Sequence, residues 1–136
     1  MKPLSLTRGH ESSAHVALKS EVVRFLRGWG YAAVLAEHHC CDVVATRSGW
    51  STVISVEIER SDRNVVKNTI RDLSQGSASV LVICPDLKVL GDVVRKLTRG
   101  LPAELWPRLA VATISTLRML SPLQSISECP FSPKTT

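Results

Sequence analysis

The chain has 136 residues, of which 44% are apolar and only 4% are aromatic, and its formal net charge is +5. This length predicts one domain, and the composition predicts a core made mostly of Val, Leu, Ile and Ala. The sequence has no apolar run near the ~18 residues of a membrane span, and its first residues lack the apolar stretch of a signal peptide. We therefore expect an intracellular, cytoplasmic protein with no membrane partner, and the positive charge favours nucleic acid as a partner.

The first half of the chain predicts one helix followed by three strands. Apolar residues recur at helical spacing over 12–28, and Gly28 or Gly30 can take the left-handed conformation that closes a helix. The expected strands are 31–37, 41–47 and 51–59. Three consecutive strands with short connections indicate an antiparallel meander.

The second half alternates helices and strands. Helical spacing over 61–74 predicts a helix with Ser61 as its N-cap. Its apolar side is formed by Val65, Val66, Thr69, Ile70 and Leu73, and its polar side by Arg63, Asn64, Lys67, Asn68 and Arg71. The remaining elements are a strand at 79–85, a helix at 86–99, a strand at 109–115 and a short helix at 116–120. The strand at 79–85 is a continuous apolar run, which is typical of a strand that is covered on both faces.

These elements give the order α-β-β-β-α-β-α-β. The meander followed by helical crossovers predicts an α/β fold with a mixed β-sheet flanked by helices. We expect the domain to occupy residues 11–120, with a flexible leader at 1–10. The tail at 121–136 is rich in Ser and Pro, which predicts disorder.

Two acids interrupt the third strand. Side chains alternate across a strand, so Glu57 and Glu59 point to one face, roughly 7 Å apart, while Val56 and Ile58 point to the core. Asp42 opens the neighbouring strand, and an antiparallel pairing can bring it towards Glu57, although the register is left open. Three such carboxylates suit Mg²⁺ or Mn²⁺. The other interpretation is an edge strand whose acids are solvated and paired to nearby basic residues.

The element order, together with a strand that carries Asp and a strand that carries Glu-x-acid, resembles the PD-(D/E)XK nuclease superfamily. The resemblance covers about residues 12–113 and is closest to the small archaeal-type Holliday junction resolvase and restriction-endonuclease-like members. It implies that Asp42 and Glu57 hold the divalent metal, with "CD" in place of "PD". It also implies that Glu21, in the first helix, completes the metal site.

The chain departs from this family where the motif has a lysine. In the family, a Lys two residues after the Glu positions or activates the attacking water, whereas here the motif reads Glu-Ile-Glu and ends at Glu59. The resemblance then gives Glu59 a role as ligand or water-orienting base. Lys67, on the helix that follows, is the candidate for the relocated lysine.

The basic residues are candidates for contacts with the phosphate backbone of DNA. This expected nucleic-acid-binding set is Arg60, Arg63, Asn64, Lys67, Arg71, Lys88, Arg95 and Arg99. The alternative for the helix at 86–99 is an ordinary solvated face. The run "HHCC" at 38–41 has no C-x₂-C partner, so we expect hairpin residues rather than a zinc site, and Cys84 reads as a small core residue.

Three functions remain open from the sequence. The first is a Mg²⁺-dependent or Mn²⁺-dependent endonuclease that hydrolyses phosphodiester bonds in DNA, including branched or double-stranded DNA, as a homodimer. The second is a nuclease-like domain that no longer cuts and binds DNA or protein instead. The third is a regulatory protein that uses its basic faces to bind DNA without metal. The missing lysine favours the second function, and the retention of Asp42, Glu57 and Glu59 favours the first.

Overall fold

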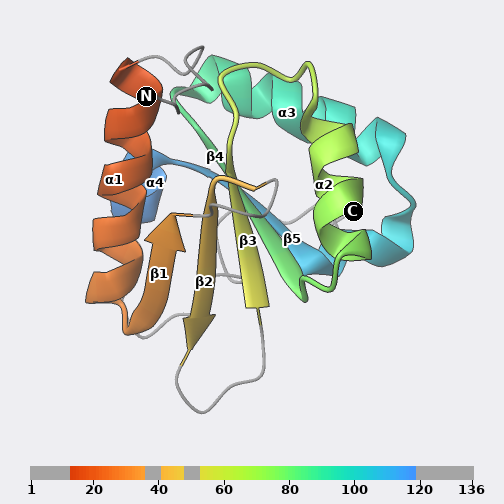
Figure 1. Ribbon diagram of the computed structural model, residues 1–136. Helices are drawn as coiled ribbons and strands as arrows, with labels where there is room; N and C mark the ends of the chain where they lie inside the picture. The colour runs from red at the N-terminus through yellow and green to blue at the C-terminus, as the bar shows by residue number, and fades with distance from the viewer. Residues whose placement is uncertain (1–12, 36–40, 48–52, 119–136) are drawn as a thin grey trace, which may run out of the picture.

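The computed structural model describes residues 13–35, 41–47 and 53–118. The expected leader at 1–10 and tail at 121–136 lie outside the described residues, as do residues 38–40 of the "HHCC" run. Figure 1 shows one sheet with helices on both sides. The fold is α/β with a mixed sheet of five strands, as the sequence predicts.

The elements follow the expected order. The helices are α1 (Ser13–Gly28), α2 (Val65–Ser74), α3 (Leu87–Gly100) and α4 (Ile114–Arg118). The strands are β1 (Tyr31–Leu35), β2 (Val43–Arg47), β3 (Val53–Ile58), β4 (Ser79–Cys84) and β5 (Leu109–Thr113). A 3₁₀ helix, η2 (Ala103–Arg108), precedes β5 and was not expected from the sequence.

The strand order in the sheet is β1-β2-β3-β4-β5. The first three strands form the predicted antiparallel meander, with Val43 opposite Val56. β4 runs parallel to β3, and β5 runs parallel to β4. β3 is therefore the strand where the antiparallel and parallel parts of the sheet meet (Figure 1).

The first helix ends as the sequence predicts. Gly30 has a φ of 93° in the turn between α1 and β1, a conformation that costs glycine nothing because it has no Cβ. The backbone N–H of Gly30 donates to the carbonyl of Arg27 at 3.0 Å. The Arg27 side chain in turn reaches the carbonyl of Ala33 at 2.9 Å, which ties the helix end to β1.

The start of α2 corrects the sequence prediction. The helix begins at Val65 rather than at 61, and its N-cap is Asn64, which makes no side-chain capping bond. Ser61 is not the cap: its hydroxyl accepts a hydrogen bond from the backbone N–H of Arg63 at 3.3 Å. A serine that bonds the backbone two residues on forms a local turn, which competes with a helix start.

Two separate cores lie on the two faces of the sheet. The first packs α1 and α4 against Ile54, Val56 and Ile58 of β3 and against the alternate residues of the other strands. The second packs α2 and α3 against β4 and β5. β4 supplies side chains to both cores, which confirms that it is covered on both faces. The second core contains no apolar side chain from β3. On this face of the sheet, a strip of polar side chains on β3 faces α2.

The close approach of α3 to α2 gives a first testable prediction. A Cβ built on Gly100 would lie 2.8 Å from Cγ2 of Val66, whose β-branched side chain is stiff. We expect Gly100→Ala to lower the free energy of unfolding by about 1–3 kcal/mol, as overpacking does. Urea unfolding measures the change. Gly91→Ala is the matched control in the same helix: a Cβ there meets no atom within 4 Å, so this variant is expected to gain about 0.5–1 kcal/mol. Equal effects at both positions would contradict the prediction.

Within the described residues, no helix is both long enough and apolar enough to cross a membrane.

Candidate functional site

The polar strip on β3 is formed by Ser55, Glu57 and Glu59, which alternate with the core residues as predicted. All three are buried, and the exposed fraction of Glu57 is only 3%. Burying a carboxylate is costly unless a cation or hydrogen bonds compensate. The partners of these acids therefore determine what the strip can do.

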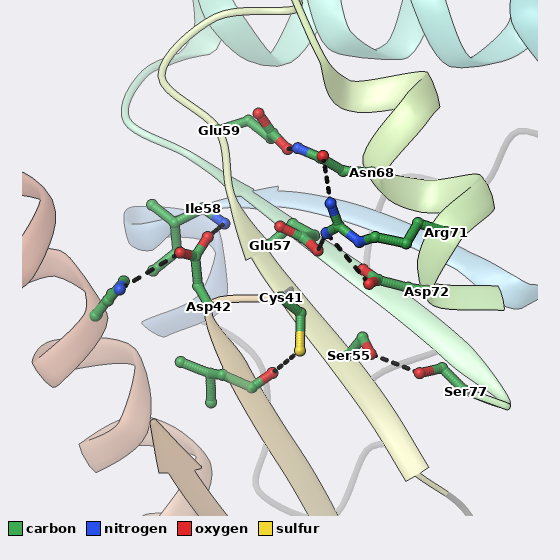
Figure 2. Close-up of polar contacts among 12 residues, drawn as sticks. Cys41, Asp42, Ser55, Glu57, Ile58, Glu59, Asn68, Arg71, Asp72 and Ser77 are labelled. Atoms are coloured by element: carbon green, nitrogen blue, oxygen red, sulfur yellow. Dashed lines mark hydrogen bonds and ion pairs between the residues drawn. The ribbon is translucent and has the colours of Figure 1, made fainter. Parts of the chain in front are cut away.

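The partners come from one face of α2 (Figure 2). Asn68 donates from Nδ2 to Oε2 of Glu59 at 2.8 Å, and Arg71 donates from Nη2 to Oε2 of Glu57 at 2.8 Å. Arg71 also donates from Nη1 to Oδ1 of Asn68 at 2.9 Å. Residues three apart on a helix are neighbours, so Asn68 and Arg71 join both acids into one network.

Asp72 adds a third carboxyl group to this network. It is 2% exposed, and its Oδ1 lies 3.4 Å from Nη2 of Arg71. Burial raises the pKa of Glu57 to about 10, and a hydrogen bond with Asp72 and the charge of Asp72 act in the same direction. The ion pair with Arg71 opposes this shift but is the weaker effect. Glu57 therefore keeps its proton near neutral pH.

Glu59 lies where β3 leaves the sheet. Its backbone N–H still donates to the carbonyl of Ile83 in β4 at 3.0 Å. Burial raises the pKa of its carboxyl, and the hydrogen bond from Asn68 lowers it. The carboxylates of Glu57 and Glu59 are thus held by different partners, one cationic and one neutral.

Asp42 is placed by a bond to β3. It forms part of a bend just before β2, and its Oδ2 accepts from the backbone N–H of Ile58 at 2.8 Å. Its own N–H donates to the carbonyl of Val56 at 3.1 Å. The Asp42 carboxylate thus accepts a backbone N–H that a carbonyl group would accept if β2 were longer. Asp42 raises the pKa of both Glu57 and Glu59 through its charge, so the register brings the three acids together.

The other side of Asp42 faces α1. Its Oδ1 lies 3.3 Å from Nε2 of His15 and 3.5 Å from Nζ of Lys19. These two residues are four apart and therefore share one face of the helix. Figure 2 shows Asp42 on the α1 side of β3, and Glu57 and Asp72 on the α2 side. The acids are accordingly flanked by cationic groups from both layers of the fold.

A cavity of about 280 Å³ lies beside Asp72. Its lining consists of Cys41, Val44, Val53, Ser55, Asp72, Gln75, Gly76 and Ser77. The hydroxyls of Ser55 and Ser77 bond each other there. Burial raises the pKa of the Cys41 thiol to about 11, so the thiol stays protonated and is a poor nucleophile.

Glu21 and Lys67 do not lie with the other predicted site residues around β3. Glu21 follows Lys19 by two positions, which is about 200° around a helix, so it does not lie on the face that carries His15 and Lys19. Lys67 is exposed on α2, and it is Arg71, four residues later, that contacts Glu57. Arg60, Arg63 and Asn64 are exposed between β3 and α2.

The predicted apolar and polar sides of α2 are partly wrong. Ile70 is 46% exposed, whereas Asn68, Arg71 and Asp72 face β3. The reason is that β3 presents carboxylates to this helix, so polar side chains are the ones that pack inward. Arg71 is consequently part of a buried ion pair as well as a predicted nucleic-acid contact.

The basic face of α3 contains an acid that reduces its charge. Lys88 and Arg95 lie 3.2 Å and 3.1 Å from the two carboxylate oxygens of Asp92. Their ammonium and guanidinium groups lower the pKa of Asp92. Arg99 is exposed at the end of the same helix. The alternative of an ordinary solvated face therefore fits Lys88 and Arg95 better than a phosphate-binding surface.

Three residues of the site were missed in the sequence: His15, Lys19 and Asp72. Asp72 had a readable signal, because Val65, Thr69 and Asp72 follow the i, i+4, i+7 pattern of a buried face, and an acid in that pattern needs a partner. The spacing of His15 and Lys19 puts them on one helix face, but only the packing of α1 shows which acid they meet.

We tested whether these residues fit a divalent cation. Within the described ranges, no group of three His, Cys, Asp or Glu residues is arranged to hold a metal ion. Mg²⁺, however, usually keeps several water ligands and needs only one or two carboxylates. The charge of Asp42 raises the pKa of Glu57 and of Glu59, so a cation beside Asp42 would relieve this repulsion. A hydrated Mg²⁺ ion on two carboxylates would need no third ligand such as Glu21, and this metal site stays a prediction.

Comparisons with known proteins give no family for this chain. No protein-family model matches it, and neither a curated protein nor a solved structure does.

Proposed function

We propose that this protein is a metal-dependent nuclease that hydrolyses phosphodiester bonds in DNA. One observation carries the proposal: the Asp42 carboxylate is bonded to the N–H of Ile58, between Glu57 and Glu59 on the adjacent strand. This is the arrangement of acids that the resemblance to the PD-(D/E)XK superfamily implies. The mixed sheet in the order α-β-β-β-α-β-α-β supports the same proposal.

Asp42 and Glu57 would hold Mg²⁺ or Mn²⁺ in this proposal, and binding of the ion would displace the proton of Glu57. The bound ion would supply a water of lowered pKa and shield the charge of the phosphate. Asn68 orients Glu59 through a hydrogen bond to Oε2, and this carboxyl group would take a proton from the attacking water. Arg71 contacts both Glu57 and Asp72, which holds the buried acids in place.

DNA is the proposed substrate because exposed basic residues follow Glu59 in the chain. Arg60, Arg63 and Lys67 are exposed where β3 connects to α2, close to Glu59 in the chain. Cations at this position suit contacts with the phosphate backbone. The proposal includes a homodimer, because each copy has one active site and cuts one strand at a time. The proposal also places the activity inside the cell.

The experiment incubates the protein with supercoiled, linear and branched DNA in Mg²⁺, in Mn²⁺ and in EDTA. We expect cleavage with either metal and none in EDTA. Gel analysis of the products identifies the preferred DNA form. Absence of cleavage with both metals on all three forms would contradict the proposal.

A second function is favoured by the basic residues that already contact the acids. Arg71 pairs with Glu57, and His15 and Lys19 contact Asp42. Such pairing also stabilises a nuclease-like domain that only binds DNA or protein. This candidate predicts that the chain binds DNA in EDTA without cutting it in either metal, and that removal of the Asp42 charge leaves this binding unchanged.

A further inference from the structure

A site built from acids needs cations to admit a phosphate. Asp42, Glu57, Glu59 and Asp72 put four carboxyl groups around β3, and those that are ionised repel the backbone of DNA. The guanidinium of Arg71 is directed at three partners, Glu57, Asn68 and Asp72. The cation for the substrate must therefore come from another side of the site.

Lys19 on α1 has the position and the exposure for this role. Its Nζ lies 3.5 Å from Oδ1 of Asp42, and its side chain is 18% exposed, so it sits at the boundary between the site and solvent. An ammonium group carries three N–H donors and can bridge two oxygens. Lys67 has a different environment, because it is exposed on the far layer, on α2.

His15 fixes the geometry of the same carboxylate. Its Nε2 lies 3.3 Å from the Asp42 oxygen that Lys19 approaches, while the other Asp42 oxygen is held by the N–H of Ile58. Asp42 is therefore held from two directions. A lysine beside an acid that is fixed in this way has a defined position relative to any phosphate bound there.

We propose that Lys19 contacts the phosphate that is cleaved and takes the role that the sequence assigned to Lys67. This inference rests on the proposed nuclease function. The ammonium group would bridge Asp42 and a non-bridging phosphate oxygen and stabilise the charge that develops there during cleavage. Lys19 is then a catalytic residue, and His15 is a positioning residue that acts through Asp42.

The test compares Lys19→Met, Lys19→Arg and Lys67→Met in steady-state cleavage of DNA with Mg²⁺. Lys19→Met is expected to lower kcat about 10²-fold, as loss of one transition-state donor does, with a smaller change in KM. Lys19→Arg is expected to recover most of this loss, because it restores the positive charge. Arg24→Met, an exposed cation on the same helix, is the matched control and is expected to leave kcat unchanged.

A measurement without metal separates a phosphate contact from a purely structural role. For DNA binding in EDTA, the slope of the logarithm of the affinity against the logarithm of the salt concentration is expected to fall by about 1 in Lys19→Met. The thermal midpoint of each variant confirms that it is folded. A salt slope that stays at the wild-type value would overturn the proposal, since it would leave Lys19 with only a structural contact to Asp42.

The remaining outcomes are also decisive. If the wild type cleaves DNA and Lys19→Met cleaves it equally well, the role of Lys19 is wrong while the nuclease function stands. If Lys67→Met lowers kcat and Lys19→Met does not, the sequence prediction that Lys67 replaces the motif lysine is right. If the wild type cleaves no DNA with either metal, both the function and the role of Lys19 fail.

Discussion

Asp42→Asn is expected to lower metal-dependent DNA cleavage by roughly 10²–10³-fold, because a metal ligand contributes several kcal/mol to the transition state and each 1.36 kcal/mol is a factor of ten. The substitution removes the charge but preserves the shape of the side chain. The amide oxygen of Asn still accepts the hydrogen bond that Ile58 donates to Oδ2 of Asp42. A loss of activity therefore reports the charge and not the support of the bend before β2. Initial cleavage rates at saturating Mg²⁺ measure the effect.

The matched control for Asp42→Asn is Glu104→Gln. Glu104 is an exposed acid in η2, away from the β3 acids in the fold, and the same chemical change there is expected to leave the rate within about twofold. Thermal midpoints show whether each variant is folded. A folded Asp42→Asn variant that cuts at the wild-type rate would remove Asp42 from the proposed site.

Arg71→Met is expected to lower the free energy of unfolding by about 3–5 kcal/mol, the usual cost of removing one partner of a buried ion pair. Arg71 lies 2.8 Å from Glu57 and 3.4 Å from Asp72, and the side chains of both acids are almost completely buried. Its removal leaves both buried carboxyl groups without this cation. Urea unfolding at pH 7 measures the change, and Lys67→Met, an exposed cation on the same helix, is the control that is expected to stay near the wild-type value.

Glu57→Gln completes the experiment because it imitates the protonated form of Glu57. The pKa of Glu57 rises from its ordinary value of 4.5 to about 10 on folding, so between these pH values the folded chain binds a proton that the unfolded chain releases. The contribution of Glu57 is therefore fully present below pH 4.5 and is lost as the pH rises towards 10. Glu57→Gln removes this loss, so its stability relative to wild type is expected to grow by on the order of 1 kcal/mol or more from pH 5 to pH 8.

The two substitutions together identify the source of the effect. In a double-mutant cycle, Arg71→Met is expected to cost about the same in the wild-type and Glu57→Gln backgrounds at pH 5 and at pH 8, because Glu57 already carries its proton in the folded chain at both pH values. A clearly smaller cost in the Glu57→Gln background at pH 8 would show that Glu57 ionises beside Arg71, and the retained proton would then be wrong.

The order and type of the elements could be predicted because long periodic patterns determine them. The run at 79–85 and the three short strands before it have strong β patterns, and β4 and the meander confirm this. Boundaries depend on local competition that periodicity does not express. Ser61 satisfies the usual rule for an N-cap, yet its hydroxyl bonds within a turn and α2 starts at Val65. η2 was missed because its sequence contains Pro107 and no helical period.

The site could be predicted only where the strand pattern determines it. Alternation along β3 was sufficient to place Glu57 and Glu59 on one face, but the partners of these acids depend on contacts between distant segments. The sequence predicts Asn68 and Arg71 on an outer polar face of the helix, because a helical wheel assumes that the sheet under the helix is apolar. The same limit explains why the sequence indicates Lys67, and not Lys19, as the replacement for the motif lysine. Lys19 lies 23 positions before Asp42 in the chain and reaches it only through the packing of α1.

The position of β3 at the junction of the antiparallel and parallel parts of the sheet has a consequence for the order of folding. The meander of β1, β2 and β3 has short connections and can form early, whereas α2 and β4 join β3 through a longer crossover and later contacts. A nascent chain that has reached only residue 60 contains Asp42, Glu57 and Glu59 but lacks Asn68, Arg71 and Asp72. Its acids have no α2 partner, so the meander cannot bury them at low cost. We infer that the carboxylates of the site become buried only when the second half of the chain has folded onto the first.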